Sequence, residues 1–309
     1  MAFTAKDVKT LREMTNVGMM DCKAALQATD GDMDKAVDWL REKGLAKAAK
    51  KASRVAAEGI AYATVIDGVG VVIEVNAETD FASKTDSFKE LVTNLALIVA
   101  KDAPADVEAL KACTYPNSNL TVTEIMQEKV MSIGENMQIR RFDRFAENQS
   151  VAYVHMGGSH AVLVNLAVEG GIDATEIGKN VAMQIAAMNA KYWDKALVPQ
   201  ADVDKELATQ IAIMDNDPKM ASKPAAVKEK IAAGKINAFF KDNCLLQQDF
   251  VRGDLFQGSV EGYIANAAKA LGGSVKFVNA IHYIKGEGIE KKEENFADEV
   301  AAQIANAGK

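Results

Sequence analysis

The histidines and cysteines are the residues of this sequence best suited to metal or nucleophilic chemistry, and their spacing supports neither. His155 and His160 lie five residues apart across Gly157-Gly158, the wrong spacing for two metal ligands on one helix face. We expect these histidines to lie at a hairpin end. The cysteines form no CxxC pair, so we expect reduced, structural thiols rather than a zinc site or a disulfide framework: Cys22, Cys113 and Cys244.

The glycine-containing segments do not match a nucleotide-binding loop. Gly234-Lys235 lacks the upstream glycine of a P-loop, and Gly286-Glu287-Gly288 is followed by Lys291 where a dinucleotide motif has its third glycine. The carboxylates are numerous but look like solvated faces. A Ser/His/Asp triad is a spatial arrangement, so the sequence leaves that alternative open. The pattern favours a protein that is not an enzyme, with no cofactor and no metal.

A phenylalanine in a polar segment is the strongest candidate for a binding residue. Phe81 lies in the segment Asn76–Lys84, after the apolar run Val71–Val75, and Asp80 precedes it. Aromatic residues in loops usually fold back onto the core, and physics alone favours that alternative. The other alternative is an exposed aromatic residue beside an acid, which is typical of an anchor for a protein partner.

Two methionines present the same choice. Met19 and Met20 follow Gly18, between two short segments of helical periodicity. Filling the core is the ordinary role of methionine, but its flexible thioether also suits a protein-binding surface.

The elements that must position these residues begin with a small helical head. Helical spacing of apolar residues predicts three helices, with Asp32 as N-cap of the third and Gly44 just past its end. Such a bundle is too small to be robust alone, so we expect it to dock on a larger body. For the basic stretch Lys43–Arg54 we favour a solvated helical linker over a phosphate contact.

A duplicated unit of hairpin, helix and strand follows the head. Alternating apolar residues and intervening turns predict the strands, and helical periodicity predicts the helices. The first copy comprises strands at 60–66 and 71–75, helices opening with capping boxes at Ser87/Glu90 and Thr121/Glu124, a helix end at Gly134, and a strand at 137–145. The second copy comprises strands at 151–156 and 161–168, a helix at 177–188 and a late strand at 275–284.

An insertion and a tail complete the chain. Two helical segments, 203–215 and 225–241, are joined through Pro218 and Pro224 and predict an antiparallel helical arm. The tail predicts a helix capped by Asn295, with Phe296, Val300 and Ile304 on one side.

The predicted fold class is therefore α+β. It comprises a helical head, a duplicated hairpin-plus-helix core, an inserted antiparallel helical arm and a C-terminal helical module. The boundaries are 1–54 for the head, 55–146 for the first core half, 147–202 with 243–285 for the second, 203–242 for the arm, and 286–309 for the terminal module.

Composition and charge limit the class of protein. The chain has 309 residues, a net charge of −7 and a pI of about 5.2. Nonspecific nucleic-acid binding requires a positive field, so we expect no nucleic-acid partner. The longest apolar stretches, such as Ala161–Val168, are too short to span a membrane, and Met1–Thr10 lacks the apolar run of a signal peptide. We therefore expect a cytoplasmic protein without a membrane partner.

Several blocks of the sequence follow one another along the chain in a recognisable order. They are Leu11–Leu26, Glu74–Ala82, Ile133–Asn136 with Ile139–Arg141, Tyr153-x-His155, and Gly286–Lys291. These blocks closely resemble those of the elongation factor Ts family, and the resemblance spans essentially the whole chain. Three positions depart from the family pattern, Asn16, Ala77 and Ala161, and they affect fine loop geometry only.

The resemblance implies a guanine nucleotide exchange factor for elongation factor Tu, acting in translation elongation without chemical catalysis. Such a factor binds both the GDP complex and the nucleotide-free form, disturbs the magnesium site, and promotes GDP release so that GTP can bind. The head would resemble a ubiquitin-associated domain, the arm would be a coiled coil, and two heterodimers could associate. The implied partner-binding residues are Thr79, Asp80, Phe81 and Ala82 for magnesium dislocation, and Arg12, Met19, Met20 and His155 for docking.

Two other classes of protein compete with this interpretation. An RNA- or ribosome-binding protein would use the basic run Lys43–Arg54, but the acidic balance and the lack of stacking aromatic residues near this run argue against it. A ubiquitin-binding adaptor would explain the head and leave the rest of the chain unexplained. Binding to purified elongation factor Tu separates the three.

Overall fold

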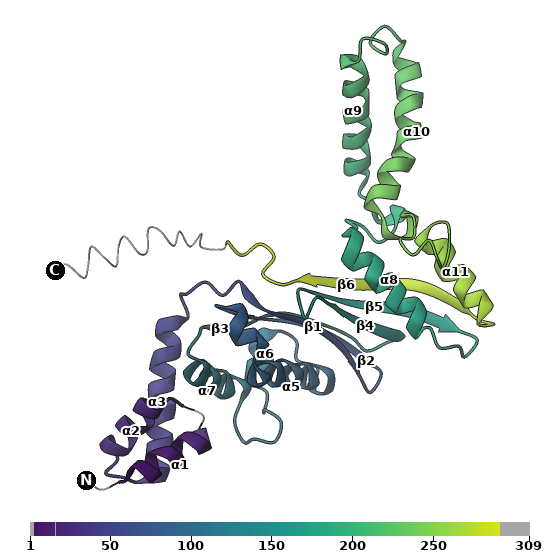
Figure 1. Cartoon of the computed structure of the whole chain (residues 1–309). Helices are drawn as coiled ribbons and strands as arrows, with labels where there is room; N and C mark the ends of the chain where they lie inside the picture. The colour runs from purple at the N-terminus through teal and green to yellow at the C-terminus, as the bar shows by residue number, and fades with distance from the viewer. Residues whose placement is uncertain (1–2, 16, 291–309) are drawn as a thin grey trace, which may run out of the picture. The chain divides into compact units, whose positions relative to one another are not determined.

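The chain is an α+β protein, as the sequence predicts (Figure 1). The computed structural model describes residues 3–15 and 17–290, apart from the side chains of 45–49. Asn16, Lys291 and the predicted terminal helix with Asn295, Phe296, Val300 and Ile304 lie outside the described residues. Two compact units are present: the first contains the described residues of 3–61, 73–142 and 284–290, and the second contains 62–72 and 143–283.

Three helices form the head of the first unit: α1 (Ala5–Thr15), α2 (Met19–Ala28) and α3 (Met33–Lys51). Asp32 caps α3, because its Oδ1 accepts a hydrogen bond from Lys35 N at 3.1 Å. The apolar faces predicted from helical spacing supply the interior of the head. Its buried members are Val8, Leu11, Val17, Cys22, Ala25, Leu26, Ala36 and Leu40.

The prediction that Gly44 ends the third helix is wrong, because α3 continues to Lys51. A Cβ added at Gly44 would lie 3.1 Å from the sulfur of Met131. The missing side chain therefore allows α3 to pass close to α7 (Val122–Ile133), and this packing, rather than a helix end, accounts for the glycine.

The first sheet along the chain has the order β1 (Glu58–Ile66), β2 (Val69–Ala77), β3 (Met137–Phe145), and its residues 58–61, 73–77 and 137–142 belong to the first unit. Four helices lie between β2 and β3: α4 (Asp80–Lys84), α5 (Asp86–Asp102), α6 (Val107–Ala112) and α7. β2 is buried over almost its whole length. One face of α5 is buried, as its periodicity predicts: Phe88, Leu91, Val92, Leu95, Ala96, Ile98, Val99 and Ala100.

One of the two predicted capping boxes is present and the other is wrong. Thr121 and Glu124 form the capping box of α7. Helix α5 is capped instead by Thr85, whose hydroxyl accepts a hydrogen bond from Phe88 N at 3.3 Å. Ser87 lies inside the helix, and its hydroxyl accepts a hydrogen bond from Lys129 Nζ at 2.8 Å. The cap moves to Thr85 because this residue is extended between the end of α4 and the start of α5.

The second unit contains the sheet order β4 (Gln149–His155), β5 (His160–Glu169), β6 (Ser274–Ile284). β4 and β5 are antiparallel, and His155 pairs with His160 at the hairpin end. Helix α8 (Thr175–Met188) lies where the sequence predicts it, whereas α11 (Val260–Ala270) is a helix that was not predicted. Both helices contribute buried residues to one apolar core with the strands.

Two helices, α9 (Gln200–Asn216) and α10 (Ala225–Asn243), form the inserted arm and lie side by side in Figure 1. Short 3-10 helices flank them at Lys195–Leu197 and Leu245–Gln247. The arm buries few residues, among them Met214, Ala232 and Ile236. Lys228 is 7% exposed, and it donates hydrogen bonds to Asp215 Oδ1 and, at 2.9 Å, to Ala221 O. Among the described residues, no helix combines the length and apolar character required to cross a membrane.

Deleting 203–242 and joining the ends with a short Gly/Ser linker should leave the rest of the protein folded. The apolar core of the second unit takes its residues from 151–185 and 245–280, on both sides of the arm in the sequence. Circular dichroism and thermal melting measure the outcome. An insoluble or molten product would mean that the arm belongs to the core and that the predicted boundaries are wrong.

Candidate functional site

Phe81 is on the surface. Its side chain is 79% exposed, so the alternative in which it folds onto the core is wrong. The segment that carries it is also not an irregular loop, because Asp80–Lys84 forms the short helix α4. Ala82 and Ser83 are buried on this helix. With these two neighbours facing the interior, Phe81 projects into solvent.

Thr79 determines where α4 begins. It is extended, with φ −125° and ψ 158°, and its hydroxyl accepts a hydrogen bond from Ala82 N at 3.3 Å. This is an N-cap, which satisfies one of the free N–H groups of the first helical turn. Ser83 adds a second local bond by donating its hydroxyl to Asp80 O at 2.8 Å.

Asp80 and Phe81 share a basic neighbour, Lys84, which is not among the predicted site residues. Lys84 Nζ donates a hydrogen bond to Asp80 Oδ2 and lies 5.8 Å from the centre of the Phe81 ring. The hydrogen bond from Lys84 lowers the pKa of the Asp80 carboxyl. The spacing of acid and base, four residues apart on a helix, is a recognisable signal once the segment is known to be helical.

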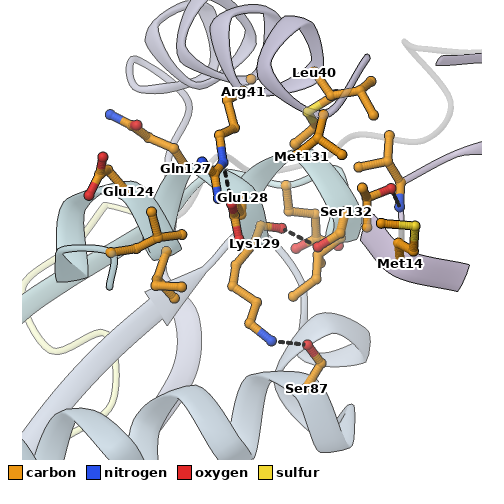
Figure 2. Close-up of a pocket in the computed structure, with 18 of the residues that line it drawn as sticks. Met14, Leu40, Arg41, Ser87, Glu124, Gln127, Glu128, Lys129, Met131 and Ser132 are labelled. Carbon is orange, nitrogen blue, oxygen red and sulfur yellow. Dashed lines mark hydrogen bonds and ion pairs between the residues drawn. The ribbon is translucent and has the colours of Figure 1, made fainter. Parts of the chain in front are cut away.

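Phe81 also forms part of a groove in the first unit. Figure 2 is a close-up of other residues that line this groove. The groove has a volume of about 930 Å³ and is lined by residues of α1, α3, α4 and α7, with others from the start of α5 and nearby loops. Its apolar lining includes Met14, Val37, Leu40, Phe81, Ile125 and Met131. Apolar surface of this kind, bordered by charged groups, suits a protein segment.

Polar side chains of α7 give the groove its charged border. Figure 2 shows Glu128 paired with Arg41 of α3, at 3.2 Å between Oε1 and Nε. It also shows Lys129 reaching Ser87 of α5. Both signs of charge therefore border the apolar surface.

The predicted docking residues of the head are exposed. Met19 and Met20 are the first residues of α2, with 44% and 74% of their surface exposed, so the core-filling alternative is wrong for both. Cys22, Ala25 and Leu26 fill the core from the same helix. Arg12 is exposed on α1. Met14, two residues further along α1, lines the groove that contains Phe81.

His155 lies in the second unit, at the exposed end of β4. Its Nδ1 is 2.9 Å from the hydroxyl of Tyr153, and its ring lies edge-on to His160, with centroids 6.1 Å apart. His160 in turn stacks on His282, with Nδ1 and Nε2 3.1 Å apart. Although the three histidines gather here, no set of three His, Cys, Asp or Glu side chains in the described part of the chain is placed to hold a metal.

The cysteines are free thiols, and Cys22 and Cys244 are buried. Burial raises the pKa of all three thiols, and that of Cys244 to about 11. Because thiolates are the reactive form, these values suit structural rather than reactive cysteines.

Comparison with known proteins identifies the family. The family model described as "Elongation factor TS" matches residues 78–287. A protein named elongation factor Ts from Nitratiruptor sp. is 45% identical over 312 residues, which cover 98% of this chain and 100% of the relative. A protein named elongation factor Ts from Clostridioides difficile is 43% identical, over 97% of this chain and 98% of the relative. Another of the same name from Magnetococcus marinus is 41% identical, over 98% of this chain and 99% of the relative. The chain therefore belongs to the elongation factor Ts family.

Proposed function

We propose that this protein is a guanine nucleotide exchange factor for elongation factor Tu and acts in translation elongation. The observation that carries the proposal, beside family membership, is the 79% exposure of Phe81 on a helix whose next two residues, Ala82 and Ser83, are buried. A large apolar side chain held in solvent by a fixed helix is typical of a partner anchor. No bond is made or broken in nucleotide exchange, so the function requires no catalytic residue.

The proposed mechanism removes the magnesium ion that supports GDP binding. A nucleotide's phosphates are held by backbone donors and by Mg²⁺, the largest positive charge in such a site. Insertion of Phe81 beside the partner's metal site displaces the elements that hold the ion, and GDP dissociates. By linkage, GDP with magnesium weakens factor binding by the same ratio, so each ligand expels the other.

The remaining candidate residues divide the task between docking and insertion. Arg12, Met19 and Met20 offer a charged and apolar docking surface on the head, and His155 offers a further contact from the second unit. The groove beside Phe81 provides apolar surface for a segment of the partner. Asp80, held ionised beside Lys84, supplies the polar contact at the edge of the inserted ring.

Release of a fluorescent GDP from elongation factor Tu tests the proposal. Addition of this protein with excess unlabelled GDP should accelerate release strongly at micromolar concentrations. Stopped-flow fluorescence measures the rate over a titration of the factor. A release rate that stays unchanged throughout the titration would refute the proposed function.

Replacing Met19 and Met20 together with alanine should weaken binding to elongation factor Tu while the protein stays folded. Both side chains are exposed, so the substitution removes contact surface without leaving a cavity. Calorimetric titration measures the affinity and circular dichroism the melting temperature. Leu26→Ala, on the buried face of the same helix, is the matched control and should lower the melting temperature. Unchanged affinity of the double variant would exclude the methionines from the interface.

A further inference from the structure

The cap of α4 is itself held by a carboxylate from a distant part of the sequence. Glu135 Oε2 accepts a hydrogen bond from Thr79 N at 2.9 Å, and its Oε1 accepts one from the Thr79 hydroxyl at 2.6 Å. The same hydroxyl oxygen accepts the bond from Ala82 N. A continuous chain of hydrogen bonds thus runs from Glu135 through Thr79 to the first turn of α4.

The end of α7 brings Glu135 to this position. Gly134 terminates the helix with φ +88°, a left-handed conformation that favours glycine, and the chain reverses there. Asn136, the next residue after Glu135, donates its backbone N–H to Glu78 Oε1 at 2.5 Å. The pairs 78–79 and 135–136 therefore exchange bonds, each supplying a carboxylate to a backbone N–H of the other.

The chemistry of the hydroxyl group gives this arrangement its direction. A threonine hydroxyl has one hydrogen, and Thr79 donates it in the hydrogen bond to Glu135. An oxygen lone pair therefore remains to accept the hydrogen bond from Ala82 N–H. Hydrogen bonds to an ionised acceptor are stronger than neutral ones, so Glu135 fixes the rotamer in which Thr79 caps α4.

We propose that Glu135 is a positioning residue for Phe81. It holds Thr79 in the capping rotamer, Thr79 holds the first turn of α4, and this turn directs Phe81 into solvent. The inference rests on the proposed function and goes beyond it, because Thr79 then supports the helix instead of contacting the partner.

Two substitutions of Thr79 separate support from contact. Thr79→Val keeps the methyl group and shape but removes the hydroxyl, and with it the bond to Glu135 and the bond from Ala82 N. It should lower the maximal rate of GDP release by about tenfold or more, since about tenfold is the scale of one lost hydrogen bond to a charged group. Thr79→Ser keeps the hydroxyl and should retain most of the activity. An active valine variant beside an inactive serine variant would show that the methyl group contacts the partner, and would overturn the proposal.

A double-variant comparison tests whether Glu135 acts through Phe81. Glu135→Ala removes both bonds from Thr79, one from its N–H and one from its hydroxyl, and should lower the maximal release rate by about tenfold or more. The factor concentration that gives half of the maximal rate should change less. In a Phe81→Ala background the same substitution should cost little more, since the residue that it positions is gone. Glu90→Ala, an exposed carboxylate on α5, is the charge control and should leave the rate unchanged. Fully multiplicative losses would refute action through Phe81.

Hydrogen exchange of the free protein provides a readout that does not depend on elongation factor Tu. Amide exchange in a peptide spanning 79–85 should accelerate by about tenfold or more in Glu135→Ala and Thr79→Val, and stay near wild type in Thr79→Ser and Glu90→Ala. Unchanged exchange in Glu135→Ala would refute the positioning role. If wild-type protein fails to release GDP while the exchange pattern holds, the proposed function fails and the link from Glu135 to α4 stands.

Discussion

Phe81→Ala is expected to slow GDP release from elongation factor Tu about thirtyfold, because truncating an aromatic anchor costs about 2 kcal/mol and about 1.4 kcal/mol corresponds to tenfold in rate. The variant should keep its own stability, since a side chain that is 79% exposed leaves no cavity when it is removed. Stopped-flow release and thermal melting measure the two effects.

Phe88→Ala is the matched control for the stability part of this prediction. Phe88 lies on the neighbouring helix α5 and is fully buried, so its removal should cost about 3–5 kcal/mol of unfolding free energy. A large loss of melting temperature in Phe81→Ala would instead assign Phe81 to the core. Asp80→Ala should slow release by a smaller factor, because Lys84 then loses the partner that holds it beside the ring.

Magnesium removal tests the route by which Phe81 acts. EDTA removes the magnesium ion, which is the step proposed for Phe81. The difference in GDP release rate between wild type and Phe81→Ala should therefore shrink when EDTA is present. A defect of equal size with and without EDTA would mean that Phe81 acts by a route other than the metal. The comparison needs no further variant, because each protein serves as its own reference.

Local periodicity predicted most of the elements. The hairpins follow from alternating apolar residues around glycine turns, as in Val151–Met156 and Ala161–Val168, which lie within β4, β5 and their turn. Amphipathic spacing located α5, α7 and α8, and the two segments joined through Pro218 and Pro224 are the helices of the arm. These predictions are correct because the spacing of apolar residues within each element determines which of its faces is buried.

The missed features depend on contacts that local periodicity does not record. Helix α11 is the exception, because its buried residues Val260, Tyr263, Ile264 and Ala268 have helical spacing. Ser259 also caps it by accepting a hydrogen bond from Gly262 N at 3.1 Å, so the sequence does carry the signals that predict this helix. Gly44 resembles a helix end because its packing partner, Met131, is remote in the sequence. Of the candidate site, the sequence located Phe81 and Asp80, but Glu135 looks like a surface acid after a helix. Its bonds join residues 56 positions apart.

Glu74 has the least exposed charged side chain that the structure describes in the first unit. The sequence places it in a family block but does not predict the network of bonds that it forms. Its side chain is 0% exposed and pairs with two arginines of β3. Oε1 lies 3.0 Å from Arg140 Nη1, and Oε2 lies 2.7 Å from Arg141 Nε. Gly286 N donates to Oε1 at 2.8 Å and Asn76 Nδ2 donates to the same atom at 3.1 Å. The carboxylate of Glu74 on β2 thus links β2 to β3 and to the segment after β6. These three parts of the chain are far apart in the sequence.

Glu74→Ala is expected to lower the unfolding free energy by about 3 kcal/mol, the lower end for breaking a buried ion pair, because the arginines retain some access to water. Their side chains are 28% and 31% exposed. Glu287→Ala is the matched control: Glu287 pairs with the same Arg141 but is 52% exposed, so its loss should cost about 0–1 kcal/mol. Urea unfolding at neutral pH measures both, and equal losses would contradict the assigned role of burial.

The contribution of Glu74 should also depend on pH, in a direction that its surroundings determine. Burial raises the pKa of its carboxyl, but the hydrogen bonds from Gly286, Asn76, Arg141 and Arg140 together outweigh burial, so the pKa lies below its ordinary value of 4.5. A carboxyl with a lowered folded pKa stabilises the protein fully above its unfolded pKa and loses that contribution as the pH falls through the folded value. The difference in unfolding free energy between wild type and Glu74→Gln should therefore stay constant from neutral pH to about 5 and shrink below about 4.5. A difference that grows on acidification would mean that the folded protein holds Glu74 protonated, and that burial outweighs the arginines.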